Sequence, residues 1–229
     1  MKIKLFISMF VATVMMLAAG DVYGQVATNA ERKAVQKHEK VLNKAMKKKA
    51  VKSARKEAKK LAKEGWMVTI GQLPLDKQLE DSWQATYEMD SEGHPYYIMS
   101  TQRGLAANFS AAQMMAMNAA KTDIAGQIET RINQVIETKV VNNEITRKDA
   151  ETLSTFVSTS KNIISTTLGR VLKFMEVYRE PKRSKSVEVM VTLGYNGNVA
   201  AQEALKAMKK SLTAEDVEVM SQIDKLVTE

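Results

Sequence analysis

The sequence predicts an α+β fold, with an Ala-rich central helix and further helices packed on a small antiparallel sheet, preceded by a long basic N-terminal helix. Three observations lead to it. Residues 110–138 contain no proline and place small and branched apolar side chains at helical spacing. The segments 171–178 and 187–195 carry the β-branched and aromatic side chains of strands, and the second alternates apolar with polar residues. Residues 31–64 hold 14 Lys or Arg against four Glu, without proline or glycine.

The first 24 residues have the order of segments of a cleavable secretory signal peptide. Lys2 and Lys4 precede the uncharged, largely apolar run 5–19, and a polar cleavage region beginning at Gly20-Asp21 follows it, with the small Gly24 before the cleavage site. That run is shorter than the roughly 20 residues that span a bilayer, so we favour cleavage before Gln25 over an uncleaved anchor. Because the chain contains no cysteine, it offers none for lipidation. The sequence therefore predicts an exported protein of the periplasm or cell envelope, neither lipidated nor transmembrane after cleavage.

Residues 25–65 are predicted to be a basic helical extension. Asn29 suits the start of the helix and Gly65 its end. The charge surplus of residues 31–64 is 14 − 4 = +10, which exceeds the net charge of +8 of the whole chain. The apolar stripe of this helix is largely Ala and can bury only a modest area. We therefore expect the helix to project from the rest of the protein or to lie loosely on it.

Residues 66–229 are predicted to form the α+β domain. In its first part we expect a short strand at 66–70, a helix from Pro74 with apolar residues spaced four apart, a turn at 90–95 and a strand at 96–101. The central helix follows. A second amphipathic helix is expected over 146–167, ended by Gly169. The remaining elements are a hairpin with one face packed on helices and two terminal helices, expected at 171–178 with 187–195, at 199–208 and at 214–227.

Part of this domain carries a pattern of residues that is similar to that of a known family. The runs Ala-Ala-Gln-Met-Met-Ala-Met-Asn-Ala-Ala-Lys (111–121) and Ile-Ala-Gly-Gln-Ile (124–128) precede a Ser-rich helix and the closing hairpin. Over about residues 96–210 the chain resembles the twenty-kilodalton bacterial envelope lipoprotein family and the related N-terminal domain of flagellar assembly protein T. The resemblance implies an Ala-rich helix laid across a short antiparallel sheet, displayed in the Gram-negative envelope. The chain departs from that family in lacking a lipidated cysteine and in carrying the basic helix, and no catalytic residues are implied.

The basic helix supplies the first candidate site. Its cations could hold the phosphates or carboxylates of a membrane surface or an anionic glycan, and a solvated helix face is the alternative. A homodimer through this helix also stays open. Nucleic acid is disfavoured because the helix has no aromatic residue to stack on bases. The candidate residues are Lys44, Lys47, Lys48, Lys49, Lys52, Arg55, Lys56, Lys59 and Lys60.

A second candidate site is a groove lined by Trp83, His94, Tyr96 and Tyr97, a mixture found in carbohydrate and peptide sites, although packing explains the aromatic residues equally well. The chain has no cysteine and only two His, 56 positions apart, so we predict neither a metal nor a cofactor. It also lacks a nucleophile motif and a phosphate-binding loop. We therefore predict a non-catalytic module that binds an envelope protein or component, with a membrane or glycan binder and an undetected hydrolase as alternatives.

Overall fold

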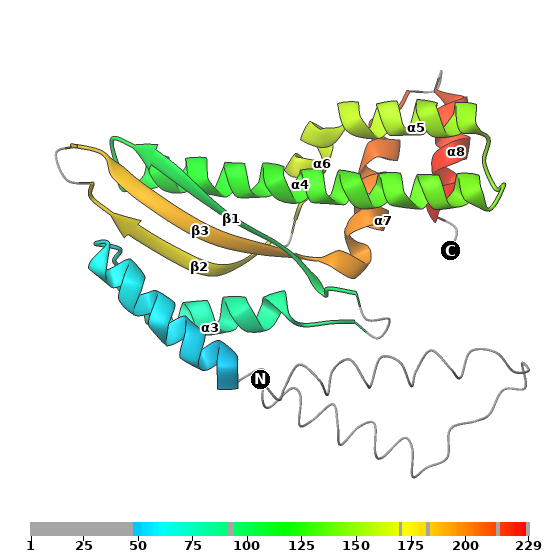
Figure 1. Cartoon of the computed structure of the whole chain (residues 1–229). Coiled ribbons are helices and arrows are strands. Elements are labelled where there is room, and N and C mark those ends of the chain that lie inside the picture. Colours follow the sequence, from blue (N-terminus) through cyan, green and yellow to red (C-terminus); the bar gives the residue numbers. More distant parts are fainter. Residues whose placement is uncertain (1–47, 91–93, 170, 182–183, 214–215, 228–229) are drawn as a thin grey trace, which may run out of the picture. The chain divides into compact units, whose positions relative to one another are not determined.

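The computed structural model describes residues 48–90, 94–169, 171–181, 184–213 and 216–227. The predicted signal peptide, the cap at Asn29 and the cations Lys44 and Lys47 lie outside the described residues. Residues Met46–Glu229 form one compact unit. The described elements are a helix over 48–63, then α3 (Leu75–Thr86), β1 (Tyr97–Ala106), α4 (Phe109–Val141), α5 (Arg147–Thr159), α6 (Lys161–Thr167), β2 (Leu172–Arg179), β3 (Val187–Asn196), α7 (Gly197–Lys210) and α8 (Val217–Val227) (Figure 1). The α+β class is confirmed.

The three strands form one antiparallel sheet in the order β1-β3-β2. The predicted hairpin is therefore present, and its second strand is the central one. β1 is longer than predicted: Gln102, Arg103 and Gly104 favour no strand by themselves, but they pair with Val191, Met190 and Val189 of β3. The predicted strand at 66–70 is reduced to one bridge between Met67 and Tyr178 at the outer edge of β2.

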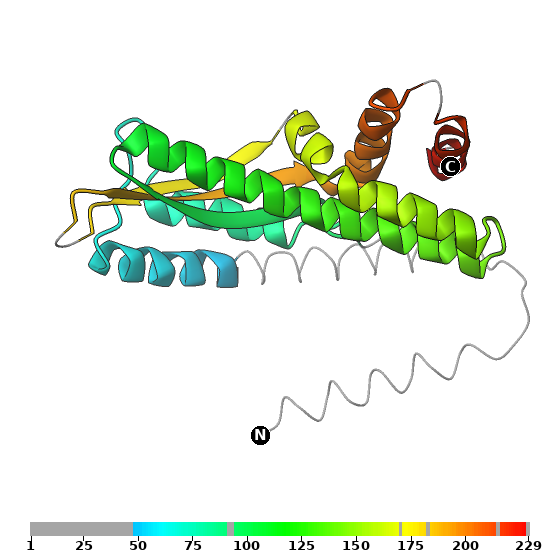
Figure 2. The same cartoon turned by 90° about the horizontal axis from the view of Figure 1, so that it is seen from above.

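One face of the sheet is covered by α4, which crosses β1 and β3 (Figures 1 and 2). Ala112, Ala116 and Ala120 are fully buried at its first half, and the fully buried Ile124 and Ile128 follow at the same spacing. Small residues let the helix axis approach the strands, while Ile fills the wider space farther along. The C-terminal half of α4 extends beyond the sheet, where α5, α6 and α7 pack against it and α8 packs on α5 and α7.

The other face of the sheet is covered as well, by α3 and the helix over 48–63 (Figure 1). The second core cluster joins Ala54, Ala58, Leu61, Trp66 and Leu79 to Met175, Val177 and Met190 of the strands. The prediction of a hairpin packed on one side only was therefore wrong, and so was that of a loosely attached helix. The Ala stripe buries little area, but the small side chains bring the helix close to the strands and Leu61 and Trp66 anchor its end.

The predicted helix 146–167 is divided into α5 and α6 at Ser160. The amide of Ser160 donates to the carbonyls of Phe156 and Val157, which ends α5, and the carbonyl of Ser160 accepts from the amide of Ile164 in α6. Ser160 is 3% exposed. Leu153, Val157 and Ile164 are all buried in the main core, so the break keeps both segments in contact with it.

The start of α5 is fixed by a capping box. The Thr146 hydroxyl accepts from the Asp149 amide at 3.2 Å, and the Asp149 carboxylate accepts from the Thr146 amide at 3.4 Å. We expect Thr146→Ala to lower the free energy of unfolding by about 1 kcal/mol, because the Asp149 amide loses the hydroxyl that accepts its hydrogen bond. Urea denaturation measures this. Thr152→Ala is the control: Thr152 is exposed within α5, where Ala favours the helix. An equal loss in both variants would contradict a role for the cap.

Candidate functional site

The described part of the basic helix carries all its cations on one side. Ala50, Ala54, Ala58 and Leu61 are buried at 0–9% exposure, and they follow one another by a helical turn. This stripe fixes the rotation of the helix on the sheet. The remaining sides then face solvent, and every described cation is exposed. We call this set the cationic face: Lys48, Lys49, Lys52, Arg55, Lys56, Lys59, Lys60 and Lys63.

Few acidic residues balance the positive charge of the cationic face. Over residues 48–64 its eight cations stand against two Glu, a surplus of 8 − 2 = +6. Lys60 and Glu57 are 3.8 Å apart, but both side chains are solvent-exposed and such a pair contributes little. On α3, a hydrogen bond from Lys77 to Glu80 raises the pKa of Lys77. The nearby positive charge of Arg55 acts in the opposite direction and lowers this pKa. The helix thus presents a positive surface next to α3.

Trp66 holds the C-terminal end of this helix to the sheet. Its ring is 3% exposed and lies 4.5 Å from the Arg179 guanidinium carbon and 5.4 Å from that of Arg103, within the range of cation–π contacts. Glu188 fixes both cations, because its carboxylate accepts from Arg179 Nε at 2.7 Å and lies 3.8 Å from Arg103. Arg179 also donates to the carbonyl of Glu64 at 3.4 Å.

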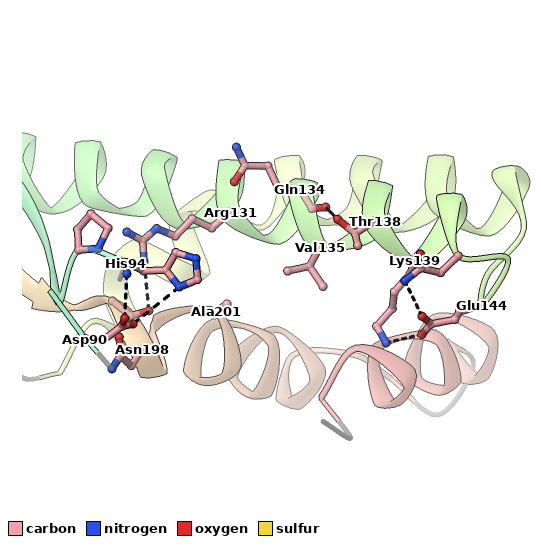
Figure 3. Close-up of a pocket in the computed structure, with 13 residues that line it drawn as sticks. Asp90, His94, Arg131, Gln134, Val135, Thr138, Lys139, Glu144, Asn198 and Ala201 are labelled. Atoms are coloured by element: carbon pink, nitrogen blue, oxygen red, sulfur yellow. Dashed lines mark hydrogen bonds and ion pairs between the residues drawn. The ribbon is translucent and has the colours of Figure 1, made fainter. Parts of the chain in front are cut away.

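A polar groove of about 840 Å³ lies at the opposite end of the sheet from Trp66, between the C-terminal half of α4, the start of α7 and the turn before β1 (Figure 3). Asp90, His94 and Arg131 line one end of it and Lys139 and Glu144 the other. The central stretch of the lining comes from α4 and includes one exposed apolar side chain, Val135, at 39% exposure.

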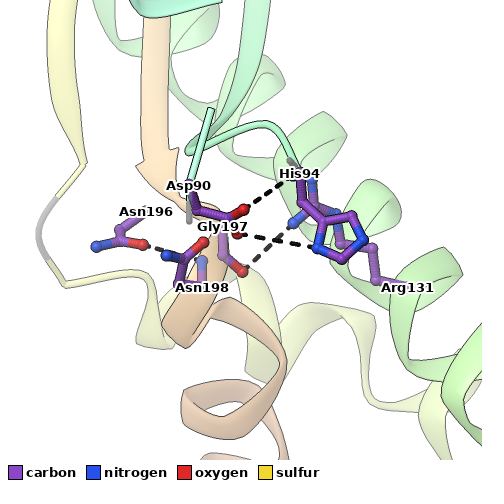
Figure 4. Close-up of polar contacts among 6 residues, drawn as sticks. All are labelled: Asp90, His94, Arg131, Asn196, Gly197 and Asn198. Carbon is purple, nitrogen blue, oxygen red and sulfur yellow. Dashed lines mark hydrogen bonds and ion pairs between the residues drawn. The ribbon is translucent and has the colours of Figure 1, made fainter. Parts of the chain in front are cut away.

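The first end of the groove is organised by Asp90 (Figure 4). Its carboxylate accepts from the His94 amide at 2.8 Å and lies 3.9 Å from the imidazole Nδ1, and the Asp90 amide donates to the His94 carbonyl at 2.8 Å. Arg131 of α4 reaches across to donate to the carbonyl of Gly197 at 3.3 Å. A Cβ at Gly197 would lie 2.7 Å from that guanidinium, so the glycine permits the contact.

The other end of the groove contains an ion pair. Lys139 is 5% exposed and donates to Glu144 at 2.8 Å, and Asn142 donates to the second carboxylate oxygen at 3.2 Å. The hydrogen bond from Lys139, followed by that from Asn142, holds the pKa of Glu144 below its usual value. Both signs of charge therefore line the groove, which suits a small polar ligand or polar protein groups.

Of the four predicted groove residues, His94 lines this groove. Tyr96 and Tyr97 do not line it but pack against each other, with ring centroids 4.8 Å apart. The ring of Phe174 lies 5.3 Å from that of Tyr97. Trp83 lies on α3, half-buried. The sequence offered no signal for Arg131, since it looks like an ordinary outer residue of an amphipathic helix. Lys139 continues the buried stripe, three residues after Ile136, and a cation at that position was the one available signal. The sequence likewise offered no signal for the two arginines that pack on Trp66, which come from β1 and β2.

The described ranges contain no group of three or more His, Asp or Glu that could hold a metal ion. None of the helices in these ranges is long and apolar enough to cross a membrane. In comparisons with known protein families, curated proteins and solved structures, nothing matches this chain. The resemblance to the envelope lipoprotein family accordingly stays a prediction.

Proposed function

We propose that the protein is an exported, non-catalytic binding module of the cell envelope, and that its cationic face holds an anionic component of that envelope. One observation carries the proposal: the buried stripe of Ala50, Ala54, Ala58 and Leu61 fixes the helix so that all eight described cations point to solvent. Any helix packed by an apolar stripe turns its charged residues to solvent, but here that side carries eight cations against two Glu over residues 48–64. A face that binds a polyanion gains from cations held in place beforehand.

The physics of this face sets its expected behaviour. Each cation close to an anionic surface contributes about 1 kcal/mol, so several acting together give useful affinity without any deep pocket. The interaction is long-range and is screened by salt over about 8 Å at physiological ionic strength. We therefore expect binding that weakens steeply as salt rises. In this proposal the helix is the principal contact of the module.

A charge-reversal variant tests the proposal. Lys52, Lys56 and Lys59 are exchanged for Glu, and binding is measured on phosphatidylglycerol vesicles and on heparin at two salt concentrations. The loss of the three positive charges should by itself weaken vesicle binding about 100-fold, and the repulsion by the new Glu side chains adds to this loss. The matched control reverses Lys148, Lys185 and Lys210, which are exposed elsewhere, and changes the net charge equally. Equal losses in both variants, or unchanged binding to both probes, would contradict the proposal.

The polar groove supports a second candidate function, in which the α+β domain itself binds a ligand or protein and the helix assists. The observation in its favour is the volume of about 840 Å³ with Arg131, His94 and Glu144 in its lining. This volume is within the range of small-molecule sites. Crosslinking in intact cells separates the two: retained capture of the same partner by the charge-reversal variant would favour the groove.

A further inference from the structure

A tight turn directly after the basic helix displays an apolar side chain to solvent. The Gln72 amide donates to the Thr69 carbonyl at 3.1 Å, which closes the turn 69–72. Gly71, with φ of +88°, occupies the third position, where a type II turn needs the left-handed region. Ile70 at the second position has a relative exposure of 104%. Together with Met67 and Leu73, at 45% and 56% exposure, it forms what we call the apolar turn.

Both ends of the apolar turn are fastened to the sheet. Met67 exchanges backbone hydrogen bonds of 2.7 and 2.9 Å with Tyr178 of β2. The carbonyl of Leu73 accepts from the Gln78 side chain at 2.6 Å, and the same side chain, 4% exposed, accepts from the Glu176 amide. Ile70 is therefore held out in water by a fixed scaffold. Single exposed apolar residues are ordinary, but three within seven residues on one fastened turn indicate an interaction surface.

The surroundings of the turn indicate what covers it. The turn runs along the outer edge of β2, and the basic helix shares a buried cluster with Met175 and Val177 of the same strand. Lys60 and Lys63, both exposed, precede Met67 by seven and four residues. A soluble polyanion would satisfy these cations but would leave Ile70 in water. An anionic bilayer offers phosphates for the cations and an apolar layer just beneath them for the turn.

We propose that the apolar turn inserts into the headgroup boundary of an anionic lipid bilayer while the cationic face lies on its surface. This inference rests on the proposed function and narrows the anionic component to a lipid surface. Ile70 is the residue that distinguishes a bilayer from other polyanions, because only a bilayer buries it. The attachment is interfacial, with no segment crossing the membrane.

The test compares two probes on the full chain with its leader removed: vesicles of phosphatidylglycerol and phosphatidylcholine, and soluble heparin. Ile70→Ser should lower partitioning onto the vesicles about tenfold, since one large apolar side chain loses its burial, and should leave heparin binding unchanged. Ile70→Leu should bind vesicles as the parent does. The serine variant should fold normally because Ile70 is fully exposed, and Leu73→Ser provides a second variant with the same expected direction.

The outcomes separate the two proposals. If both serine variants bind vesicles like the parent while the charge-reversal variant no longer binds vesicles or heparin, the proposed insertion is overturned. The proposal that the cationic face binds an anionic component is then still supported. If a serine variant loses heparin as much as vesicles, the turn contacts polyanions directly and the insertion is again overturned. If charge reversal changes neither probe, the proposed function fails. Loss on vesicles alone for both serine variants supports the insertion.

Discussion

Trp66→Ala is expected to lower the free energy of unfolding by about 3–5 kcal/mol, the usual cost of truncating a buried aromatic residue. Trp66 is 3% exposed and is the largest side chain of the cluster between the basic helix and the sheet. Its removal leaves a cavity beside Leu61 and Val177. It also takes the ring away from Arg103 and Arg179, which keep their contacts with Glu188 but lose the cation–π contacts.

The loss should be concentrated in one part of the protein. Because Trp66 anchors the end of the basic helix, amide hydrogen exchange in residues 48–63 should rise more than exchange in α4, which packs on the opposite face of the sheet. Urea denaturation followed by circular dichroism gives the free energy, since this signal does not depend on the missing indole. Trp66→Phe should fall between the parent and the alanine variant.

The second tryptophan supplies the control. Trp83 is half-buried on α3 and belongs to neither core cluster, so Trp83→Ala should cost clearly less. If the two alanine variants unfold at the same urea concentration, or if exchange rises equally on both faces of the sheet, Trp66 is not the anchor of the basic helix.

The sequence predicted best where the hydrophobic period was long. The regular spacing of Ala112 to Ile136 identified α4 within three residues of each end, because a helix buried along one side repeats its signal many times. The hairpin could be predicted because its signal also repeats along the strand: every second residue from Val187 to Tyr195 is apolar and faces α4. Export and the leader fall on residues the structure does not describe, and they stay predictions.

The second layer was missed because its signal is weak in the sequence. The alternate residues Met190, Thr192 and Gly194 of β3 look like a solvent-facing set, yet these three are buried. Met190 shares a buried cluster with a helix whose contact stripe is largely Ala, and Ala has too little area to reveal a packed face by itself. Gly194 is covered instead by Met99 and Phe174. Burial of this face depends on the pairing of segments far apart in the chain, which periodicity cannot show.

The candidate sites also contain features that the sequence could predict and features that only the folded chain shows. The cations of the basic helix were visible as composition, but only the packing of the Ala stripe revealed that they share the exposed side. The groove was largely invisible, because Arg131 of α4 meets Asp90, His94 and Gly197 only in the folded chain. The apolar turn was read as part of a strand, since Val68 and Ile70 favour one.

A methyl group added at Gly104 is expected to destabilise the protein by about 3 kcal/mol, at the upper end of the cost of overpacking. At Gly104 of β1, α4 lies close against the sheet. A Cβ there would lie 2.2 Å from the carbonyl oxygen of Ala112, 2.7 Å from the Ala116 amide and 2.9 Å from the Met115 Cβ. Two of these atoms belong to helix backbone, so relief requires moving α4 away from β1 and β3.

Gly126→Ala is the matched control, because the same methyl group enters the same helix–sheet unit with the opposite expected sign. Gly126 lies inside α4, and its Cβ would meet only the flexible end of Lys161, at 3.0 Å. The helix interior gains up to about 1 kcal/mol when Ala replaces Gly. Urea denaturation should therefore place the two variants on opposite sides of the parent. A Gly104→Ala variant as stable as the parent would mean that α4 is not seated against β1 at this position, and the close packing of its Ala half would have to be abandoned.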